Sequence, residues 1–123
     1  MNKRRRRTPA PVTFERLREL ALALPGAEEG TSYGTPAFRV RGKLFARLHQ
    51  DGEAVVVRID FDERRLRMES EPQTFFITDH YLRYPMMLVR LARVYDDDLE
   101  VLLEQSWRIV APQRLVAERD SRS

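Results

Sequence analysis

Cysteine is absent from the 123-residue sequence, and histidine occurs only twice. Without cysteine, the chain cannot form a disulfide scaffold, a thiolate zinc site or a cysteine nucleophile. Two histidines also exclude a multi-histidine metal site. No P-loop, dinucleotide-binding glycine pattern or nucleophile elbow is present. We therefore predict no enzymatic activity, no metal site and no cofactor.

Long apolar runs are missing as well, since none approaches the roughly 20 residues that a membrane-spanning helix requires. The basic N-terminus also differs from a secretory signal. A signal needs an uncharged core after its basic residues, whereas this chain has Glu15, Arg16, Arg18 and Glu19. We expect a cytoplasmic protein with no membrane partner.

Positive charge is concentrated at the N-terminus, although the formal net charge is only +3. The first 13 residues contain no acid and five basic side chains, namely Lys3, Arg4, Arg5, Arg6 and Arg7. Residues 14–123 carry 17 basic and 19 acidic side chains, so the remainder is slightly acidic. Because like charges and prolines disfavour a packed element, residues 1–12 are predicted to form a disordered basic arm.

Residues 34–48 predict a β-hairpin with Arg41 and Gly42 at its tip, because glycine tolerates the positive φ of a tight turn. If Val40 pairs with Lys43, cross-strand partners share a face. One face then carries Phe38, Val40, Lys43, Phe45 and Arg47. The other carries Ala37, Arg39, Leu44, Ala46 and Leu48. This mixed pattern is typical of a sheet that helices cover on one side only.

Two helices are indicated on either side of the hairpin. Thr13 is a suitable N-cap for apolar residues that recur at helical spacing up to Leu24. Residues 28–36 are rich in turn formers and predict a loop. Asp60 and Glu63 resemble a capping box that begins a short helix ending near Met68.

The remaining patterns complete the predicted fold. A β-branched run predicts a central strand at residues 54–59, and further strands are expected at 74–78 and 86–91. Three aspartates begin a helix over residues 96–110, because carboxylates complement the positive end of the helix dipole. Pro112 then breaks the helix or starts a short turn through Leu115 and Val116.

The order of elements is helix, three strands, short helix, two strands and helix. Short turns between consecutive strands favour an antiparallel sheet of about five strands with flanking helices, which is an α+β fold. We expect a single domain over residues 13–118, preceded by the basic arm at 1–12 and followed by a frayed tail at 119–123.

Four short motifs in this order resemble the MmcQ/YjbR family over about residues 13–116. They are Gly42-Lys-Leu-Phe-Ala46 in the hairpin, Asp79-His-Tyr81 before the last strand, Ser106-Trp107, and Ala111-Pro112. The resemblance implies an α+β fold similar to type III secretion chaperones. Family members have been likened to a "double wing" and labelled DNA-binding because of that shape, and no defined reaction is implied.

The basic residues predict a nucleic-acid interface in two parts. The arm residues Lys3, Arg4, Arg5, Arg6 and Arg7 would bind phosphates largely without sequence preference, or they form a solvated tail that aids solubility. The hairpin would contact DNA as a wing, or its basic residues are ordinary solvent-facing strand residues. The wing residues are Arg39, Arg41, Lys43 and Arg47.

A cleft is the alternative site, formed if the loop at 28–36 meets the loop at 79–85. It would be lined by Glu28, Glu29, Tyr33, His80 and Tyr81, with Lys43 nearby. A histidine close to a carboxylate suffices for acid–base chemistry. The alternative is a hydrogen-bonded histidine at a loop corner with half-buried tyrosines.

Other conspicuous residues favour structural roles. Trp107 lies on the apolar face of the last helix and is expected in the core. Met86 and Met87 point to opposite sides of a strand. We therefore predict a small binding domain that contacts DNA or RNA electrostatically. The alternative is a chaperone-like module that binds another protein or itself.

Overall fold

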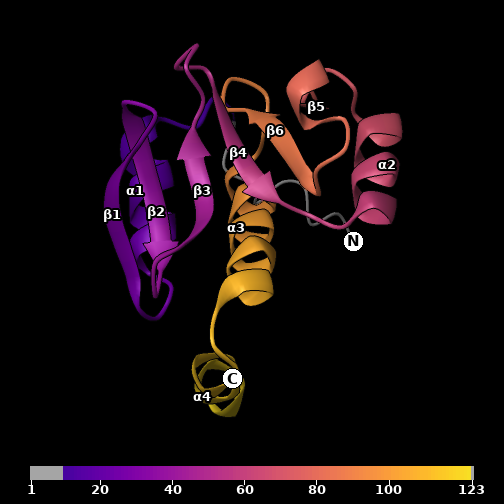
Figure 1. The fold of residues 1–123 in the computed structure, drawn as a ribbon. Coiled ribbons are helices and arrows are strands. Elements are labelled where there is room, and N and C mark those ends of the chain that lie inside the picture. Colours follow the sequence, from indigo (N-terminus) through magenta and orange to yellow (C-terminus); the bar gives the residue numbers. More distant parts are fainter. Residues whose placement is uncertain (1–9, 123) are drawn as a thin grey trace, which may run out of the picture.

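The computed structural model describes residues 10–122 and contains a six-stranded antiparallel sheet with the order β1-β2-β3-β4-β6-β5 (Figure 1). The strands are β1 (Ala27–Ser32), β2 (Thr35–Val40), β3 (Lys43–Leu48), β4 (Ala54–Arg58), β5 (Phe75–Phe76) and β6 (Met86–Arg90). The α+β fold class predicted from the sequence is confirmed, with one more strand than expected. β4 is central, as its apolar sequence predicted.

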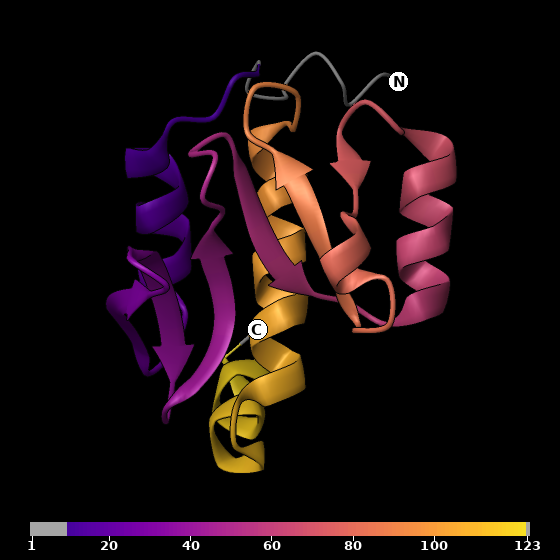
Figure 2. The same cartoon turned by 45° about the horizontal axis from the view of Figure 1, so that its top comes forward.

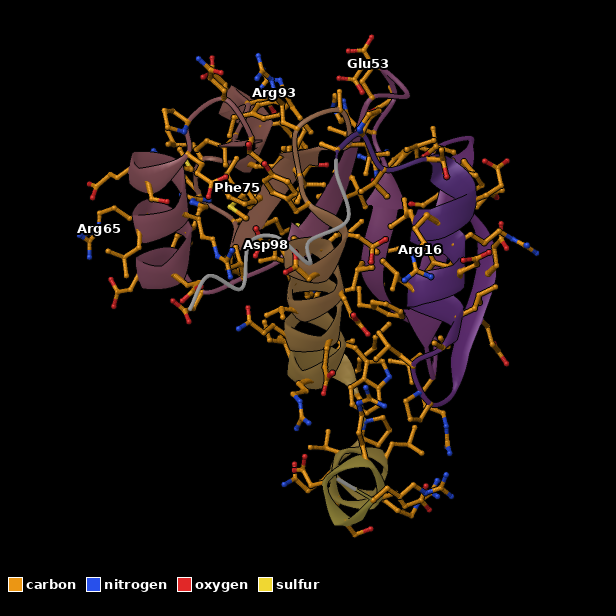
Figure 3. All side chains as sticks on the ribbon, turned by 180° about the vertical axis from the view of Figure 1, so that it is seen from behind. Arg16, Glu53, Arg65, Phe75, Arg93 and Asp98 are labelled. Atoms are coloured by element: carbon orange, nitrogen blue, oxygen red, sulfur yellow. The ribbon has the colours of Figure 1, made fainter. Side chains whose placement is uncertain are left out.

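Helices cover one face of this sheet. α1 (Phe14–Leu22) and α3 (Asp96–Val110) pack side by side behind the strands (Figures 1 and 3). α2 (Phe61–Ser70) stands at the edge of the sheet beside β5 (Figure 2). α4 (Gln113–Ser121) follows the end of α3. No helix among residues 10–122 has the length and apolar character needed to cross a membrane.

The main core lies between the sheet and the two covering helices. Its largest side chain is Trp107, which is fully buried and donates a hydrogen bond from Nε1 to the Pro25 carbonyl oxygen at 2.9 Å. Met87 also lies in this core, whereas Met86 packs against a smaller cluster on the opposite face. The core position of Trp107 and the opposite directions of the two methionines are therefore confirmed.

The opposite face of the sheet is covered only in part. Ala54, Val56 and Leu88 are buried there beneath Tyr81, which belongs to the 3₁₀ turn η2 (Asp79–Tyr81). η2 is therefore the element that covers the part of this face formed by β4 and β6.

Both predicted N-caps are confirmed. The Thr13 hydroxyl accepts a hydrogen bond from the Arg16 backbone N–H at 3.1 Å, and the Asp60 carboxylate accepts one from the Glu63 N–H at 2.8 Å. α3 begins at Asp96, as the aspartate run predicted. The Asp96 carboxylate binds the Arg16 guanidinium through two hydrogen bonds, of 2.6 and 3.1 Å, which tie α1 to the start of α3.

The segment predicted as a loop is an edge strand. β1 pairs with β2 over six residue pairs, and Tyr33 and Gly34 form the turn between them with φ of 53° and 80°. This strand was not predicted from the sequence because it contains Glu28, Glu29 and Gly30, which are poor strand formers. Charged residues are common on edge strands, where they discourage pairing with other chains.

The predicted β2–β3 hairpin is confirmed at its tip but not along its length. Arg41 and Gly42 form the turn with φ of 51° and 79°, and Val40 pairs with Lys43. Arg39 pairs with Leu44, but Phe38 pairs with Ala46, so Phe45 is an extra residue in the ladder. One extra residue reverses the alternation of side chains. Arg47 therefore faces away from the main core, opposite to Phe45, and not with it as predicted.

Ser106 on α3 links strands β3 and β4 beside this bulge through its side-chain hydroxyl. Its hydroxyl accepts a hydrogen bond from the Arg58 backbone N–H at 2.9 Å and donates one to the Phe45 carbonyl oxygen. The β3–β4 ladder ends at the preceding pair, Ala46 and Val57. The side chain thus bridges two strands where the direct backbone bond is missing, which gives the Ser106-Trp107 motif a structural role.

Two predicted boundaries are wrong. Val12, assigned to the arm, is buried in the core, and its backbone N–H donates to the Leu91 carbonyl oxygen at 2.7 Å. Residues 119–121, assigned to a frayed tail, belong to α4. Arg119 holds them because its guanidinium donates two hydrogen bonds to the Glu104 carboxylate on α3. The arm residues Lys3, Arg4, Arg5, Arg6 and Arg7 lie outside the described residues.

Candidate functional site

A cleft of about 240 Å³ lies where the β1–β2 turn and the end of β3 meet η2. Three of its side chains were predicted to meet, and the structure brings these three together: Tyr33, His80 and Tyr81. The other lining residues are Arg47, His49, Gln50 and Thr78. The cleft thus combines three cationic or titratable side chains, two tyrosine rings and two neutral polar groups.

Arg47 is the most buried side chain of the cleft, with 4% of its surface exposed. Its Nη2 donates to the Tyr81 hydroxyl at 2.8 Å. Nη1 makes three longer contacts, of 3.3 to 3.5 Å, to oxygens of Thr35, Leu48 and Gln50. The guanidinium also lies 5.5 Å from the centre of the Tyr33 ring.

A second buried arginine fixes the segment that contains η2. Arg64 on α2 is 9% exposed, and its Nη1 and Nη2 donate to four backbone carbonyl oxygens at 2.8 to 3.1 Å. The accepting residues are Tyr81, Leu82, Tyr84 and Met86. These bonds connect α2 to the loop and thereby hold Tyr81 over the sheet.

The two histidines of the cleft differ in surroundings. His80 is exposed and its ring stacks edge-on against Tyr81, with centroids 4.7 Å apart. His49 Nδ1 is buried, lies 3.3 Å from Asp51 Oδ2 and makes no hydrogen bond within residues 10–122. Partial burial raises the pKa of Asp51, but the hydrogen bond from the Glu53 N–H and the proximity of His49 outweigh it and leave that pKa below its ordinary value.

Two residues predicted for the cleft lie elsewhere. Glu29 forms an ion pair with Arg18, and Glu28 sits across from Arg39 in the β1–β2 ladder. Both belong to β1, which extends away from the cleft instead of looping into it. Lys43, expected nearby, is at the far end of β3 and does not line the cleft. The predicted acid–base pair of His80 with a carboxylate of β1 therefore does not form.

The predicted wing residues are also separated. Arg41 and Lys43 are exposed at the hairpin tip, and Arg39 is half-buried opposite Glu28. Arg47 instead belongs to the cleft, which the sequence prediction missed because the bulge at Phe45 was not anticipated. His49 and Gln50 were missed as well. The Asp51-Gly52 turn signal, which places them at the end of a strand, was the available clue. No cluster of three potential metal-ligating side chains exists within the described part of the chain.

The fold and the cleft define a small α+β domain whose second sheet face is only partly covered. The model of the YjbR family matches residues 22–109, and the chain belongs to this family. The resemblance drawn from the four sequence motifs is therefore confirmed.

The chain is also similar to individual proteins in sequence and in fold. The chain is 38% identical over 66 residues to the uncharacterized protein Rv2570 of Mycobacterium tuberculosis and equally to the uncharacterized protein Mb2600 of Mycobacterium bovis. The match covers 53% of this chain and 51% of each relative. The crystal structure of Deinococcus radiodurans protein DR2400, with the family domain DUF419, has a similar fold. Its TM-score is 0.72 at 21% identity, over 84% of this chain and 81% of that one.

Proposed function

We propose that this domain binds nucleic acid and catalyses no reaction. The contacts would come from the basic residues at positions 3–7 and from the tip of the β2–β3 hairpin. The observation that supports the proposal is the exposure and the lack of ion pairs of two cationic side chains at the hairpin tip, Arg41 and Lys43. Both are exposed, and neither forms an ion pair within residues 10–122. Cations without a carboxylate partner remain available for phosphate oxygens.

The hairpin tip suits contact with a phosphate backbone better than base readout. Two positive side chains flank Gly42, so a backbone can approach the turn closely. Arg39 contributes less, because Glu28 faces it across the ladder. We therefore expect binding that depends strongly on salt and weakly on sequence.

Fluorescence anisotropy with labelled DNA and RNA at two salt concentrations tests the proposal. Three proteins are compared with the full chain: a deletion of residues 1–8, the double variant Arg41→Gln/Lys43→Gln, and Arg65→Gln/Arg93→Gln. The last pair is the control, since it removes two exposed charges that lie away from the hairpin tip (Figure 3). Both the deletion and the tip variant should weaken binding more than the control does.

Two outcomes would contradict the proposal. Equal affinity of the tip variant and the control would show that the hairpin makes no contact. A full-length protein with no affinity at low salt that sediments as a concentration-dependent dimer would favour the alternative, binding of another protein or a second copy.

A further inference from the structure

We infer that the cleft around Arg47 is a binding site for a phosphate group carried by a small ligand or by the phosphorylated end of a nucleic acid. Arg47 and the Tyr81 hydroxyl would contact the phosphate, and the Tyr33 ring would cover the group that carries it. The inference is independent of the proposed function, because Arg41 and Lys43 do not line the cleft.

The first argument is an uncompensated buried charge. Arg47 is 96% buried, yet it forms no ion pair with any carboxylate of residues 10–122. Buried charges are normally paired, because removing them from water is costly. The nearby Asp51 does not fill this role, since its carboxylate faces the Glu53 N–H and His49.

The second argument is the set of donors that the protein leaves unused. Arg47 Nε has no hydrogen-bond partner within the described residues, and the contacts of Nη1 are long. Tyr81 accepts a hydrogen bond from Arg47 but donates none from its hydroxyl within the same residues. Thr78 and the Gln50 amide add further donors at the rim. Several donors around one cation match the oxygens of a phosphate.

The third argument is the exposed ring at the mouth of the cleft. Tyr33 is 84% exposed and sits in a strained turn position with φ of 53°, while its ring lies over the Arg47 guanidinium. The exposed His80 ring also lines the cleft. An aromatic group attached to the phosphate would contact these rings, so such a ligand should bind more tightly than inorganic phosphate.

Amide chemical-shift mapping by NMR on the intact chain tests the site without any variant. Inorganic phosphate and phenyl phosphate should both shift the amide signals of Tyr33, Arg47, Gln50 and His80, and phenol should not. Phenyl phosphate should bind at least several-fold more tightly than inorganic phosphate. Shifts confined to the hairpin tip, or no shifts at millimolar phenyl phosphate, would overturn the inference.

Variants separate the contributions of charge and ring. Arg47→Met should weaken both ligands by roughly 10- to 100-fold, the range for a hydrogen bond to a charged group. Arg90→Met is the matched control, because Arg90 is exposed on the same face but does not line the cleft. It should leave binding unchanged. If both arginine variants weaken binding equally, general electrostatic attraction explains it and the site is refuted.

Tyr33→Asn keeps the test valid if Arg47→Met fails to fold, since asparagine tolerates the positive φ of this turn. It should abolish the preference for phenyl phosphate and leave the binding of inorganic phosphate unaffected. An unchanged preference would contradict the role of the ring.

Oligonucleotides with a 5′-phosphate or a 5′-hydroxyl identify the source of the phosphate group. Tighter binding of the phosphorylated form, lost in the cleft variants, assigns the site to nucleic-acid ends, and equal binding assigns it to small phosphate esters.

Discussion

At the scale of single residues, Ser106 shows how one hydroxyl can replace a backbone hydrogen bond. The bulge at Phe45 leaves a carbonyl oxygen on β3 without a direct partner on β4. The Ser106 hydroxyl donates a hydrogen bond to this oxygen and accepts one from the Arg58 N–H, and the side chain is fully buried. This hydroxyl on an otherwise apolar helix face therefore has a structural role in the sheet rather than a role in ligand binding.

Ser106→Ala should lower the free energy of unfolding by about 2–3 kcal/mol, because it leaves a buried donor and a buried acceptor without a partner. Urea denaturation followed by circular dichroism measures the change. Ser70→Ala, at an exposed position near the end of α2, should stay within about 0.5 kcal/mol of the wild type. Equal stability of the two variants would show that the bridge contributes nothing.

At the scale of elements, α4 is held against the rest of the fold by apolar packing, chiefly of Leu115, and by an ionic network. Leu115 is buried and approaches Gly26, where an added Cβ would lie 3.1 Å from Leu115 Cδ1 and 3.3 Å from Val40 Cγ2. On the ionic side, Glu104 of α3 accepts hydrogen bonds from Arg108 and Arg119. α4 therefore depends on both contacts.

Gly26→Ala should destabilise the protein through backbone strain and through the loss of space for Leu115. Strain alone at a positive φ, here 72°, costs about 1–3 kcal/mol. Gly52→Ala isolates the strain, because Gly52 has φ of 73° and open space around its Cα. Chemical denaturation should find Gly26→Ala the less stable variant. A smaller loss than in Gly52→Ala would show that α4 does not pack tightly here.

The ionic network makes stability depend on pH. The hydrogen bonds from Arg119, supported by those from Arg108 and opposed by partial burial, lower the pKa of Glu104 to about 2 from its ordinary value of 4.5. A lowered pKa in the folded state stabilises the fold above the ordinary value, and this stabilisation is lost as pH falls from about 4.5 toward 2. Glu104 is partly exposed, so screening reduces the effect to about 1–2 kcal/mol.

Glu104→Gln should therefore be less stable than the wild type by about 1–2 kcal/mol at pH 6. The difference between the two proteins should shrink as pH falls toward 2, because the wild-type carboxyl becomes protonated as pH approaches its pKa of about 2. Denaturation curves at pH 6, 4 and 2.5 measure the difference. A difference that stays constant across this range would mean that packing of the side chain, not its charge, stabilises α4.

At the scale of the whole molecule, the sequence predicted those elements that local patterns specify. α1, α2 and α3 begin at recognisable caps or carboxylates, and β4 has a continuous apolar run. β1 was missed because its strand character comes from pairing with β2 and not from its own residues. The end of α4 was missed because Arg119 is fixed by Glu104, which lies 15 residues earlier in the chain.

The candidate site was predicted in part for the same reason. Tyr33, His80 and Tyr81 were expected together because two loops were expected to meet. Arg47 was assigned to the opposite face because strict alternation was assumed, and the extra residue Phe45 reversed it. A register shift of one residue cannot be seen in a hydrophobic pattern when both faces of a hairpin are mixed.

The salt dependence of DNA binding gives a quantitative test of the whole charge distribution. Each phosphate contact contributes about −0.9 to the slope of log K against log salt concentration for duplex DNA. Five arm residues and two hairpin residues then predict a slope of about −6 for the full chain. Arg41→Gln/Lys43→Gln should change it to about −4.5, and deletion of residues 1–8 should change it to about −2.

Titrations between 50 and 200 mM salt, in steps of about 50 mM, resolve these slopes. The slightly acidic composition of residues 14–123 supports this division of contacts, because their 17 basic side chains are outnumbered by 19 acidic ones. A slope that survives the deletion intact would place the DNA contacts on the folded domain alone.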